Sequence, residues 1–524
     1  MLFFKKSLVV FSAVMALLCG CGQTEVKASE TSENLITLEQ AVKIAVENNT
    51  DLFISQKQID ASEGAEQSAA GAFDRQVSTS VSYSNSKAGI FDDDTDLRPD
   101  NKVAGTNTSY NMNYSKKSRS GQTIGATVST LQELDNKIPS QKRHNTGNVN
   151  MNVTIPLGQG KGKAVTTAPE KAAKKTTDAS RHDYNQQLAS LILNVSAAYW
   201  DYMADFQKLE ILKDAEKRNQ KIVENAKNLA RKKIISKNEL DALIGSLNDK
   251  THIRIQVENA CRESSEKLSL LLGVYTSKAF NVPCPADKFP EVPKDLKLSN
   301  YGNFEMCLNK AFTLRPDYLA AEARLKSAEF TLVSAKDAVR PGVNLQLGAG
   351  YTGIDNGTSK TAMFTSLNNN LKGANATASV TYQWPSDNNS AKGNFKQQKA
   401  AFEQANARYL ALKKQIKSSL AVAYSNLQKS IDAFQSANDA VSAYLKSADH
   451  ESAKYSSRKN SSIDMITIED RLASAKINAV DASCDYAKSL LNFKYELGLV
   501  YGVYYSDKII SFKELTSIED ITSR

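Results

Sequence analysis

The segments VSTSVSYS (residues 77–84), NVNMNVTI (148–155) and ATASVTYQW (376–384) decide the fold, because apolar and small polar residues alternate in each of them. A period of two places successive side chains on opposite faces of a β-strand. Residues 343–351 repeat the pattern with Val343, Leu345 and Leu347 on one face. The polar face of these segments carries small, uncharged residues. We therefore expect strands of about ten residues with one apolar face and one uncharged polar face.

Two environments produce such strands. A transmembrane β-barrel has lipid on its apolar face and water on its polar face. A soluble sheet that covers a core on one side has the same alternation. Tyr83, Tyr351, Tyr382 and Trp384 lie near segment ends, as aromatic residues do at a membrane interface. We favour the barrel and keep the soluble sheet as the alternative.

The amino terminus favours export. Lys5 and Lys6 precede an apolar run over residues 7–18, which is the pattern of a secretory signal and is too short to serve as a membrane anchor. Leu-Cys-Gly-Cys at 18–21 resembles the processing site of bacterial lipoproteins. That resemblance implies removal of residues 1–20 and attachment of acyl chains such as palmitate to Cys21, followed by a polar tether over 21–35. The alternative is an ordinary signal peptide that contains two cysteines.

No other stretch approaches the roughly 18 apolar residues of a membrane helix, so we expect any crossing of a membrane to be made by strands.

The body of the chain contains an internal sequence duplication. One constant spacing aligns Ala198-Tyr199 with Ala423-Tyr424 and Leu272-Gly273 with Leu497-Gly498, and a longer constant spacing aligns Asp51 with Asp317. We expect a first structural repeat at 36–273, with strands at about 76–156. A Pro-containing connector at 274–303 leads to a second repeat at 304–498, with strands at about 342–384. A tail follows at 499–524.

Extra strand-like segments, 110–115 and 124–130, lie around a basic turn in the first repeat only. They form either an extracellular hairpin or an extension of the sheet, within an extra region of about 105–131.

Long helices flank the strands. We expect an opening helix from Thr37 to about residue 72, and a counterpart over 304–339 that Pro316 interrupts. Residues 178–233 contain no proline or glycine, which predicts a helix roughly 80 Å long. The hydroxyls of Ser236 and Ser461, each followed three residues later by a carboxylate, predict the starts of returning helices. Gly273 and Gly498 predict left-handed helix ends.

The composition excludes several classes of function. The net charge of +9, from 66 basic and 57 acidic residues, is small for 524 residues and forms no arginine-rich arm, so we expect no nucleic-acid partner. The four histidines are scattered, and no nucleophile elbow is present, so we expect no enzyme, no metal and no cofactor. Cys284 and Cys307 flank the connector and either form a disulfide or remain two free thiols.

Five segments carry a family resemblance: ITLEQAVKIAVENN (36–49), AAGAFDRQVSTSVSYS (69–84), LNKAFTLRPDYLAAEARLKSAE (308–329), SKNELDAL (236–243) and SSIDMITIEDRL (461–472). In this order, duplicated and separated by paired strands, they resemble the TolC-like outer membrane efflux proteins over about residues 36–503. The resemblance implies an α+β membrane protein built from a duplicated helix–strand–long helical hairpin. Three copies would each give four strands to one transmembrane β-barrel, continued by a periplasmic α-helical barrel.

The resemblance also implies a function. The chain would be a lipid-anchored channel in the outer membrane of a Gram-negative bacterium, with a large periplasmic portion. It would serve as the exit duct of a tripartite efflux or type I secretion system, with a periplasmic adaptor and an inner-membrane transporter as partners. The alternative is an envelope lipoprotein whose coiled coil is a structural scaffold without a channel. Neither the transported substrate nor the gating residues follow from the sequence.

The resemblance places the adaptor contacts at the tips of the helical hairpins. The matching residues are Lys233, Ser236, Glu239, Arg458, Ser461 and Asp464. Many family members have glycine three residues before the hairpin serine, where this chain has Lys233 and Arg458. The tips are therefore more basic than the family pattern, and a simple solvated turn is the alternative interpretation of these residues.

Overall fold

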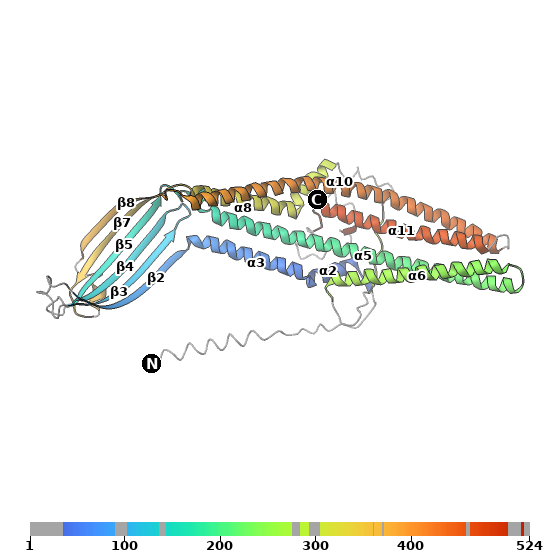
Figure 1. The fold of residues 1–524 in the computed structure, drawn as a ribbon, viewed down its shortest axis with the longest axis horizontal. Helices are drawn as coiled ribbons and strands as arrows, with labels where there is room; N and C mark the ends of the chain where they lie inside the picture. The colour runs from blue at the N-terminus through green and yellow to red at the C-terminus, as the bar shows by residue number, and fades with distance from the viewer. Residues whose placement is uncertain are drawn as a thin grey trace, which may run out of the picture.

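The computed structural model describes residues 35–89, 102–135, 143–274, 283–292, 304–359, 361–368, 371–456, 462–500 and 515–517. One sheet lies at one end of an elongated molecule, and long helices run from it to two hairpin turns at the opposite end (Figure 1). The leader, Cys21, Arg458 and Ser461 lie outside the described residues.

The predicted strands form a single antiparallel sheet, and the alternation of side chains continues through it. The strands are β2 (Arg75–Gly89), β3 (Lys102–Lys117), β4 (Thr123–Asp135), β5 (His144–Pro156), β7 (Gly342–Asp355) and β8 (Leu371–Gln383), and they lie side by side in this order. The number of strands differs from the four that the family resemblance implies.

The difference comes from the hairpin β3–β4, which extends the sheet between β2 and β5. Because β2 starts at the helical end of the sheet, β3 returns to that end, and the basic turn after Lys117 lies against the helices. The two segments therefore extend the sheet, which is one of the two predicted alternatives.

Each half contains a short helix, a longer helix that runs to the sheet, and a long hairpin. The first half has α2 (Leu38–Asn48), α3 (Thr50–Ala70), α5 (Ala168–Arg231) and α6 (Lys237–Leu272). The second half has α7 (Phe304–Leu314), α8 (Pro316–Ala338), α10 (Asn389–Ser456) and α11 (Ser462–Glu496). Smaller elements are β1 (Leu35–Ile36), η1 (Gly71–Phe73), α4 (Lys163–Thr166), β6 (Cys284–Pro285) and α9 (Ala362–Thr365).

The predicted helix signals are present. Thr37 starts α2 with a capping box, in which its hydroxyl accepts from the backbone nitrogen of Gln40 at 3.3 Å and the Gln40 side chain accepts from the Thr37 nitrogen at 3.1 Å. The proline-free stretch forms α5, which is 64 residues long. Gly273 and Gly498 end their helices with φ of 68° and 75°.

The opening helix is interrupted, contrary to the prediction of one continuous helix from Thr37. The break falls at Asn49, which matches Arg315 in the second half under the longer repeat spacing. Asn49 is the C-cap of α2 and the N-cap of α3, with its Oδ1 accepting from the Leu52 nitrogen at 2.8 Å. The second half makes the same break with Pro316 at the first helical position.

Four helices connect to the sheet and form one layer. Helix α3 leads into β2 through η1, α5 follows β5, α8 leads into β7, and α10 follows β8. Helix α5 packs against α3 and α8, and α8 also packs against α10 (Figure 1). The helix order therefore repeats the order of the strands to which the helices connect, and the hairpin β3–β4 occupies the position between α3 and α5.

Apolar clusters hold the halves together. The largest joins α2, α5, α6 and α11 around Tyr199, Trp200 and Leu268, and a second joins α7, α10 and α11 around Leu420 and Phe493. Each of these side chains is at most 2% exposed, so the two clusters form a close-packed core in the middle of the molecule.

Candidate functional site

The sheet has two chemically different faces across its whole width. The register aligns one row of side chains from every strand on the polar face: Ser78, Asn113, Thr127, Asn150, Gly350 and Asn375. The adjacent row lies on the opposite face: Val77, Tyr114, Ala126, Met151, Ala349 and Ala376. The inserted hairpin follows the same alternation as the other four strands, so all six strands share one uncharged polar wall in these rows.

Hydrogen bonds join side chains across this polar wall. The Thr127 hydroxyl donates to Oδ1 of Asn113 at 3.0 Å, and the Thr352 hydroxyl donates to Oδ1 of Asn148 at 2.8 Å. The Asn150 side chain lies over Gly350, where a Cβ would come 2.0 Å from its Oδ1. These side chains therefore pair with one another along the wall.

Much of the apolar face is exposed in the single chain, although α9 covers the part around Tyr110 and Gly147. Val81, Tyr83, Met151 and Val380 are each 64–68% exposed, although they share one face of one sheet. An apolar patch of this extent normally meets lipid or another protein. The outer strands β2 and β8 each pair with one neighbour, which leaves two edges for further pairing.

The hairpin tips lie at the end of the molecule opposite the sheet (Figure 1). Ser236 caps α6 as predicted, with its hydroxyl accepting from the Glu239 nitrogen at 3.1 Å. Asp464 is exposed in the first turn of α11. Leu243 and Ile466 belong to one buried cluster, so the two hairpins pack together just behind their tips.

Lys233 has a left-handed backbone conformation at the end of α5. Its φ is 57°, in the left-handed region that favours glycine. The nitrogen of Lys233 donates to the Ala230 carbonyl at 2.9 Å, and that of Ile234 donates to the Leu229 carbonyl at 3.0 Å, which closes the end of α5. The turn therefore has a glycine-like backbone conformation with a cationic side chain at its apex.

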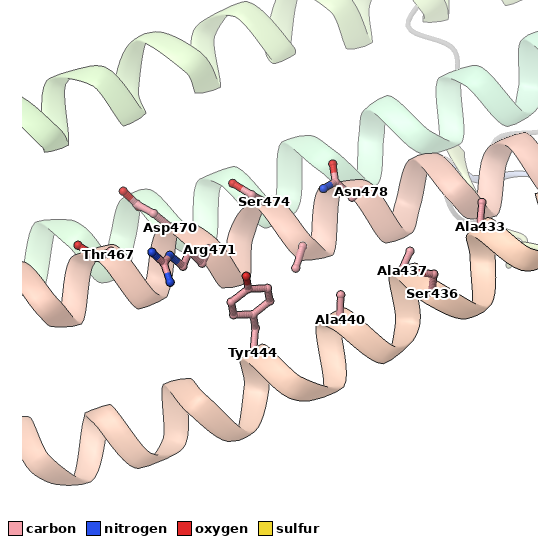
Figure 2. A pocket seen from close by; sticks show the side chains of 11 residues that line it. Ala433, Ser436, Ala437, Ala440, Tyr444, Thr467, Asp470, Arg471, Ser474 and Asn478 are labelled. Atoms are coloured by element: carbon pink, nitrogen blue, oxygen red, sulfur yellow. The ribbon is translucent and has the colours of Figure 1, made fainter.

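A groove of roughly 690 Å³ lies between α10 and α11, behind the tip of the second hairpin (Figure 2). Small side chains and Tyr444 of α10 line one wall, and mostly polar side chains of α11 line the other, among them Asp470 and Arg471. Asp470 also pairs with Lys250 of α6 at 3.0 Å, so the α11 wall is tied to the first hairpin. The groove offers space for the side chains of another helix.

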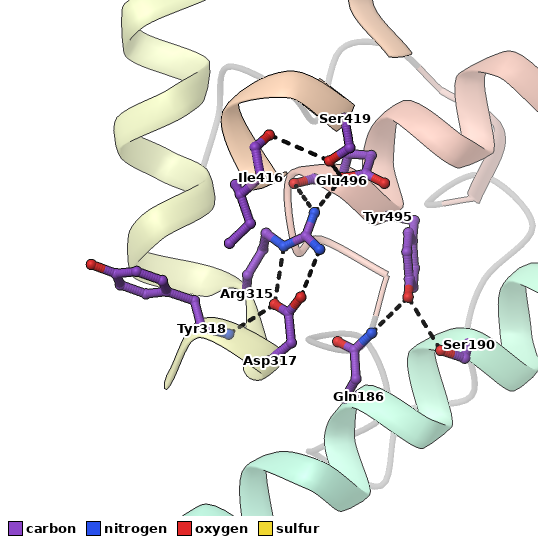
Figure 3. Close-up of polar contacts among 9 residues, drawn as sticks. All are labelled: Gln186, Ser190, Arg315, Asp317, Tyr318, Ile416, Ser419, Tyr495 and Glu496. Carbon is purple, nitrogen blue, oxygen red and sulfur yellow. Dashed lines mark hydrogen bonds and ion pairs between the residues drawn. The ribbon is translucent and has the colours of Figure 1, made fainter. Parts of the chain in front are cut away.

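An ion-pair cluster, here called the charged joint, connects Arg315, at the break between α7 and α8, to Glu496, at the end of α11 (Figure 3). Arg315 donates to both carboxylate oxygens of Asp317, at 3.0 and 2.7 Å, and also to Glu496. Burial opposes its charge, but the Asp317 and Glu496 carboxylates raise the pKa of Arg315 above its ordinary value. A Cβ on Gly498 would come 2.8 Å from the Arg315 nitrogen, so glycine is required for this close approach.

Tyr495, which precedes Glu496 in the chain, contacts the first half of the molecule. Gln186 of α5 donates to the Tyr495 hydroxyl at 2.6 Å, and Ser190 lies 3.2 Å from it (Figure 3). Residues Arg315 and Tyr495 had no predicted role, because their partners lie far away in the sequence.

The thiols are unpaired. Cys261, Cys284, Cys307 and Cys484 are all free, so the disulfide alternative for Cys284 and Cys307 is wrong. Burial raises the pKa of the Cys261 thiol to about 11 and that of Cys484 to about 12. Within the described residues, no group of three or more histidine, cysteine or acidic side chains is arranged to hold a metal ion.

Among the described helices, none is both long and apolar enough to span a bilayer.

Comparisons with known proteins agree with the two-faced sheet and long hairpins. Residues 307–498 match the family model of the outer membrane efflux proteins. No curated protein matches the sequence. The predicted resemblance to the TolC-like outer membrane efflux proteins is confirmed.

Solved outer-membrane channels share the fold. The outer-membrane channel OprN aligns with a TM-score of 0.61 and 16% identity over 88% of this chain and 89% of that chain. The Campylobacter jejuni CmeC outer membrane channel aligns with a TM-score of 0.61 and 14% identity over 90% of this chain and 87% of that chain. The Neisseria gonorrhoeae MtrE outer membrane channel aligns with a TM-score of 0.56 and 16% identity over 88% of this chain and 89% of that chain.

Proposed function

We propose that this chain, whose second half matches the outer membrane efflux proteins and whose fold is that of their channels, is an outer-membrane exit duct. Three copies would form the channel of a tripartite efflux or type I secretion system. The observation that carries the proposal is the sheet with an uncharged polar row on one face and an exposed apolar row on the other. Long helical hairpins would extend the duct into the periplasm.

The open edges of the sheet support assembly. In lipid, the unpaired backbone groups of β2 and β8 would lack hydrogen-bond partners, which is strongly unfavourable. Pairing of β8 with β2 of the next copy removes every edge when the ring closes. The apolar face then meets lipid, and the Ser, Asn and Thr face surrounds water.

The position of β1 is compatible with a lipid anchor at Cys21. The carbonyl oxygen of Ile36 lies 3.1 Å from the hydroxyl of Tyr199, in the middle of α5. About 46 Å of helix separates Tyr199 from Ala168 at the sheet end of α5. The segment from Cys21 to Leu35 spans at most about 50 Å when extended. Its length is therefore just sufficient for the acyl chains to enter the inner leaflet of the membrane that the sheet would cross.

The tips are proposed to contact the adaptor. Lys233, Ser236, Glu239 and Asp464 lie at or next to the ends of α5, α6 and α11 that are farthest from the sheet, where a periplasmic partner would approach first. Their mixed charge suits a polar contact with the helical hairpin of an adaptor, which in turn would reach the inner-membrane transporter. Arg458 and Ser461 remain predicted members of this contact.

The mass and conductance of the mature protein test the channel. The protein purified from membranes in detergent is expected to have the mass of three chains and to conduct ions after insertion into a planar bilayer. A monomer that does not conduct would exclude the duct and favour the alternative of a scaffold lipoprotein. For the anchor, a Cys21→Ala variant should lose acyl labelling; labelling equal to that of the parent would exclude Cys21 as the lipid site.

A further inference from the structure

We infer that the hairpin β3–β4 is part of the channel wall and gives the assembled duct a ring of eighteen strands, six from each of three copies. This inference rests on the proposed trimeric channel. It adds a property of that channel, namely an outer segment as wide as the helical segment below it.

The hairpin is fully integrated into the sheet. Strand β3 pairs with β2 over all fifteen residues of β2, from Arg75 opposite Lys116 to Gly89 opposite Lys102. Strand β4 pairs with both β3 and β5 without a register shift. Ser82 and Ser109 lie 2.7 Å apart across the β2–β3 pair. A hairpin folded outside the wall would leave β2 and β5 to pair directly, whereas here they are separated by two strands.

The turn of the hairpin is fastened to the helix layer. The Arg119 guanidinium donates to both carboxylate oxygens of Glu170 on α5, at 3.0 and 2.6 Å, and lies 4.9 Å from the centre of the Phe73 ring. Phe73 ends η1, directly after α3. Arg119 therefore joins the two helices between which the hairpin enters.

Glycine allows this turn to sit close to the start of α5. Gly121 has a φ of 101°, and a Cβ there would come 2.4 Å from the Gly160 carbonyl oxygen. The Gly162 nitrogen donates to the Ser120 carbonyl at 3.3 Å. The turn therefore packs closely against the segment that connects β5 to the helices.

The widths of the two layers explain why the extra strands fit. Four helices at interaxial distances of about 9 Å occupy roughly 36 Å. Six strands spaced about 4.8 Å and tilted about 40° occupy roughly 38 Å, whereas four such strands occupy roughly 25 Å. The hairpin therefore brings the sheet to the width of the helix layer.

In the closed ring, the strand segment and the helix segment would therefore have similar widths. Eighteen strands give a barrel of about 36 Å backbone diameter, against about 24 Å for twelve strands. After subtraction of side chains, the bores are about 25 Å and about 14 Å wide. The wall in the central rows carries Ser, Asn, Thr and Gly without charges, so it selects little by charge. The outer segment would therefore be wide enough for bulky hydrated solutes, including polypeptide segments with secondary structure, as well as for small molecules.

Polymer exclusion tests the width. Neutral polyethylene glycols of graded size are added to the strand side of channels in planar bilayers, and the drop in conductance reports entry. The parent channel is expected to admit polymers of about 20 Å hydrodynamic diameter, and a variant lacking residues 102–135 is expected to exclude them while admitting those of about 10 Å. A control variant lacking residues 361–368 removes α9 but no strand, and should keep the parent cut-off.

The outcomes separate this inference from the proposed function. Equal cut-offs in the parent and the 102–135 deletion would overturn the wide ring but leave the channel in place. If the deletion variant does not assemble, cryo-electron microscopy of the parent trimer decides, because eighteen consecutive strands support the inference and twelve with β3–β4 outside the ring overturn it. A parent protein that forms neither trimers nor channels would overturn both.

Discussion

The hydroxyl of Tyr199 donates a 2.8 Å hydrogen bond to Oδ2 of Asp287, and the same oxygen accepts from the backbone nitrogen of Leu38 at 2.6 Å. Asp287 belongs to the segment that follows β6, which pairs in parallel with β1. One carboxylate thus fixes the start of α2 against the middle of α5. A negative charge at a helix N-terminus is favourable, and burial makes this contact stronger than an exposed one.

Loss of this carboxylate should destabilise the middle of the molecule. We expect Asp287→Ala to lower the free energy of unfolding by about 2–3 kcal/mol and Tyr199→Phe by about 1 kcal/mol, because each leaves a buried or half-buried polar group with one hydrogen-bond partner fewer. The double variant should lose less than the sum of the two. Thermal unfolding in detergent, followed by circular dichroism, measures the effect. Lys288 is exposed, so Lys288→Ala should change little, and an equal effect of Lys288→Ala and Asp287→Ala would contradict the assignment.

Tyr199 also predicts a pH dependence. Burial and the hydrogen bond to Asp287 raise the pKa of the Tyr199 hydroxyl well above its ordinary value of 10.0. A pKa raised in the folded state stabilises the protein fully below the unfolded value, and this stability is lost as the pH rises above about 10. Between about pH 10 and 12 the Tyr199→Phe variant should therefore lose stability less steeply than the parent. Parallel slopes in thermal unfolding would exclude this role.

Lys233→Gly should stabilise the first hairpin tip. The φ of 57° that Lys233 adopts is unfavourable for lysine by about 1 kcal/mol of conformational free energy, whereas glycine adopts it without this cost. The control is Lys232→Gly, where φ is −82° and a side chain is unstrained, so that glycine should destabilise by up to about 1 kcal/mol. Hydrogen exchange of the tip measures both changes. Destabilisation by Lys233→Gly would show that the lysine side chain makes a compensating contact.

The features predicted correctly are those that neighbouring residues determine. The alternation of β2, the capping box at Thr37 and the left-handed Gly273 each depend on a few consecutive residues. The break at Asn49 was missed because asparagine, unlike Pro316, is compatible with a continuing helix. The sheet order was not predicted, because the position of β3–β4 depends on pairing and on the Arg119–Glu170 contact, 51 residues apart.

Gly498→Ala should disrupt the joint at Arg315. The added methyl group would meet the backbone nitrogen of Arg315 at 2.8 Å, and the φ of 75° is unfavourable for alanine. We expect a loss of at least about 2 kcal/mol in the free energy of unfolding. Gly245→Ala is the control, because nothing lies within 4 Å of the place that its methyl group would take and alanine favours a helix, so it should stabilise by up to about 1 kcal/mol. Similar unfolding temperatures for the two variants would refute the steric requirement.

The thiols should differ in reactivity. Cys261, Cys307 and Cys484 are buried, and burial raises the pKa of each thiol, so that few thiolates form near pH 8. Cys284 is only half-buried. Brief treatment with a water-soluble maleimide, followed by peptide mass spectrometry, should label Cys284 first and the other three only after unfolding. Early labelling of Cys484 would mean that α11 separates from α5 in the native protein.

A pair of adjacent residues tests which face of the sheet meets water. Asn150 lies on the polar face and Met151 on the apolar face of β5. In the proposed channel, Asn150→Asp adds three carboxylates to the bore, so reversal potentials in a salt gradient should shift toward cation selectivity while assembly is retained. Met151→Asp places the same charge in lipid, at a penalty of up to about 2–4 kcal/mol per copy, and should reduce the amount of trimer recovered from membranes. If Met151→Asp changed selectivity and Asn150→Asp blocked assembly, the faces would be assigned the wrong way round. If neither variant had an effect, the sheet would not form the wall of a pore, because a charged ring cannot be neutral to both lipid and permeating ions.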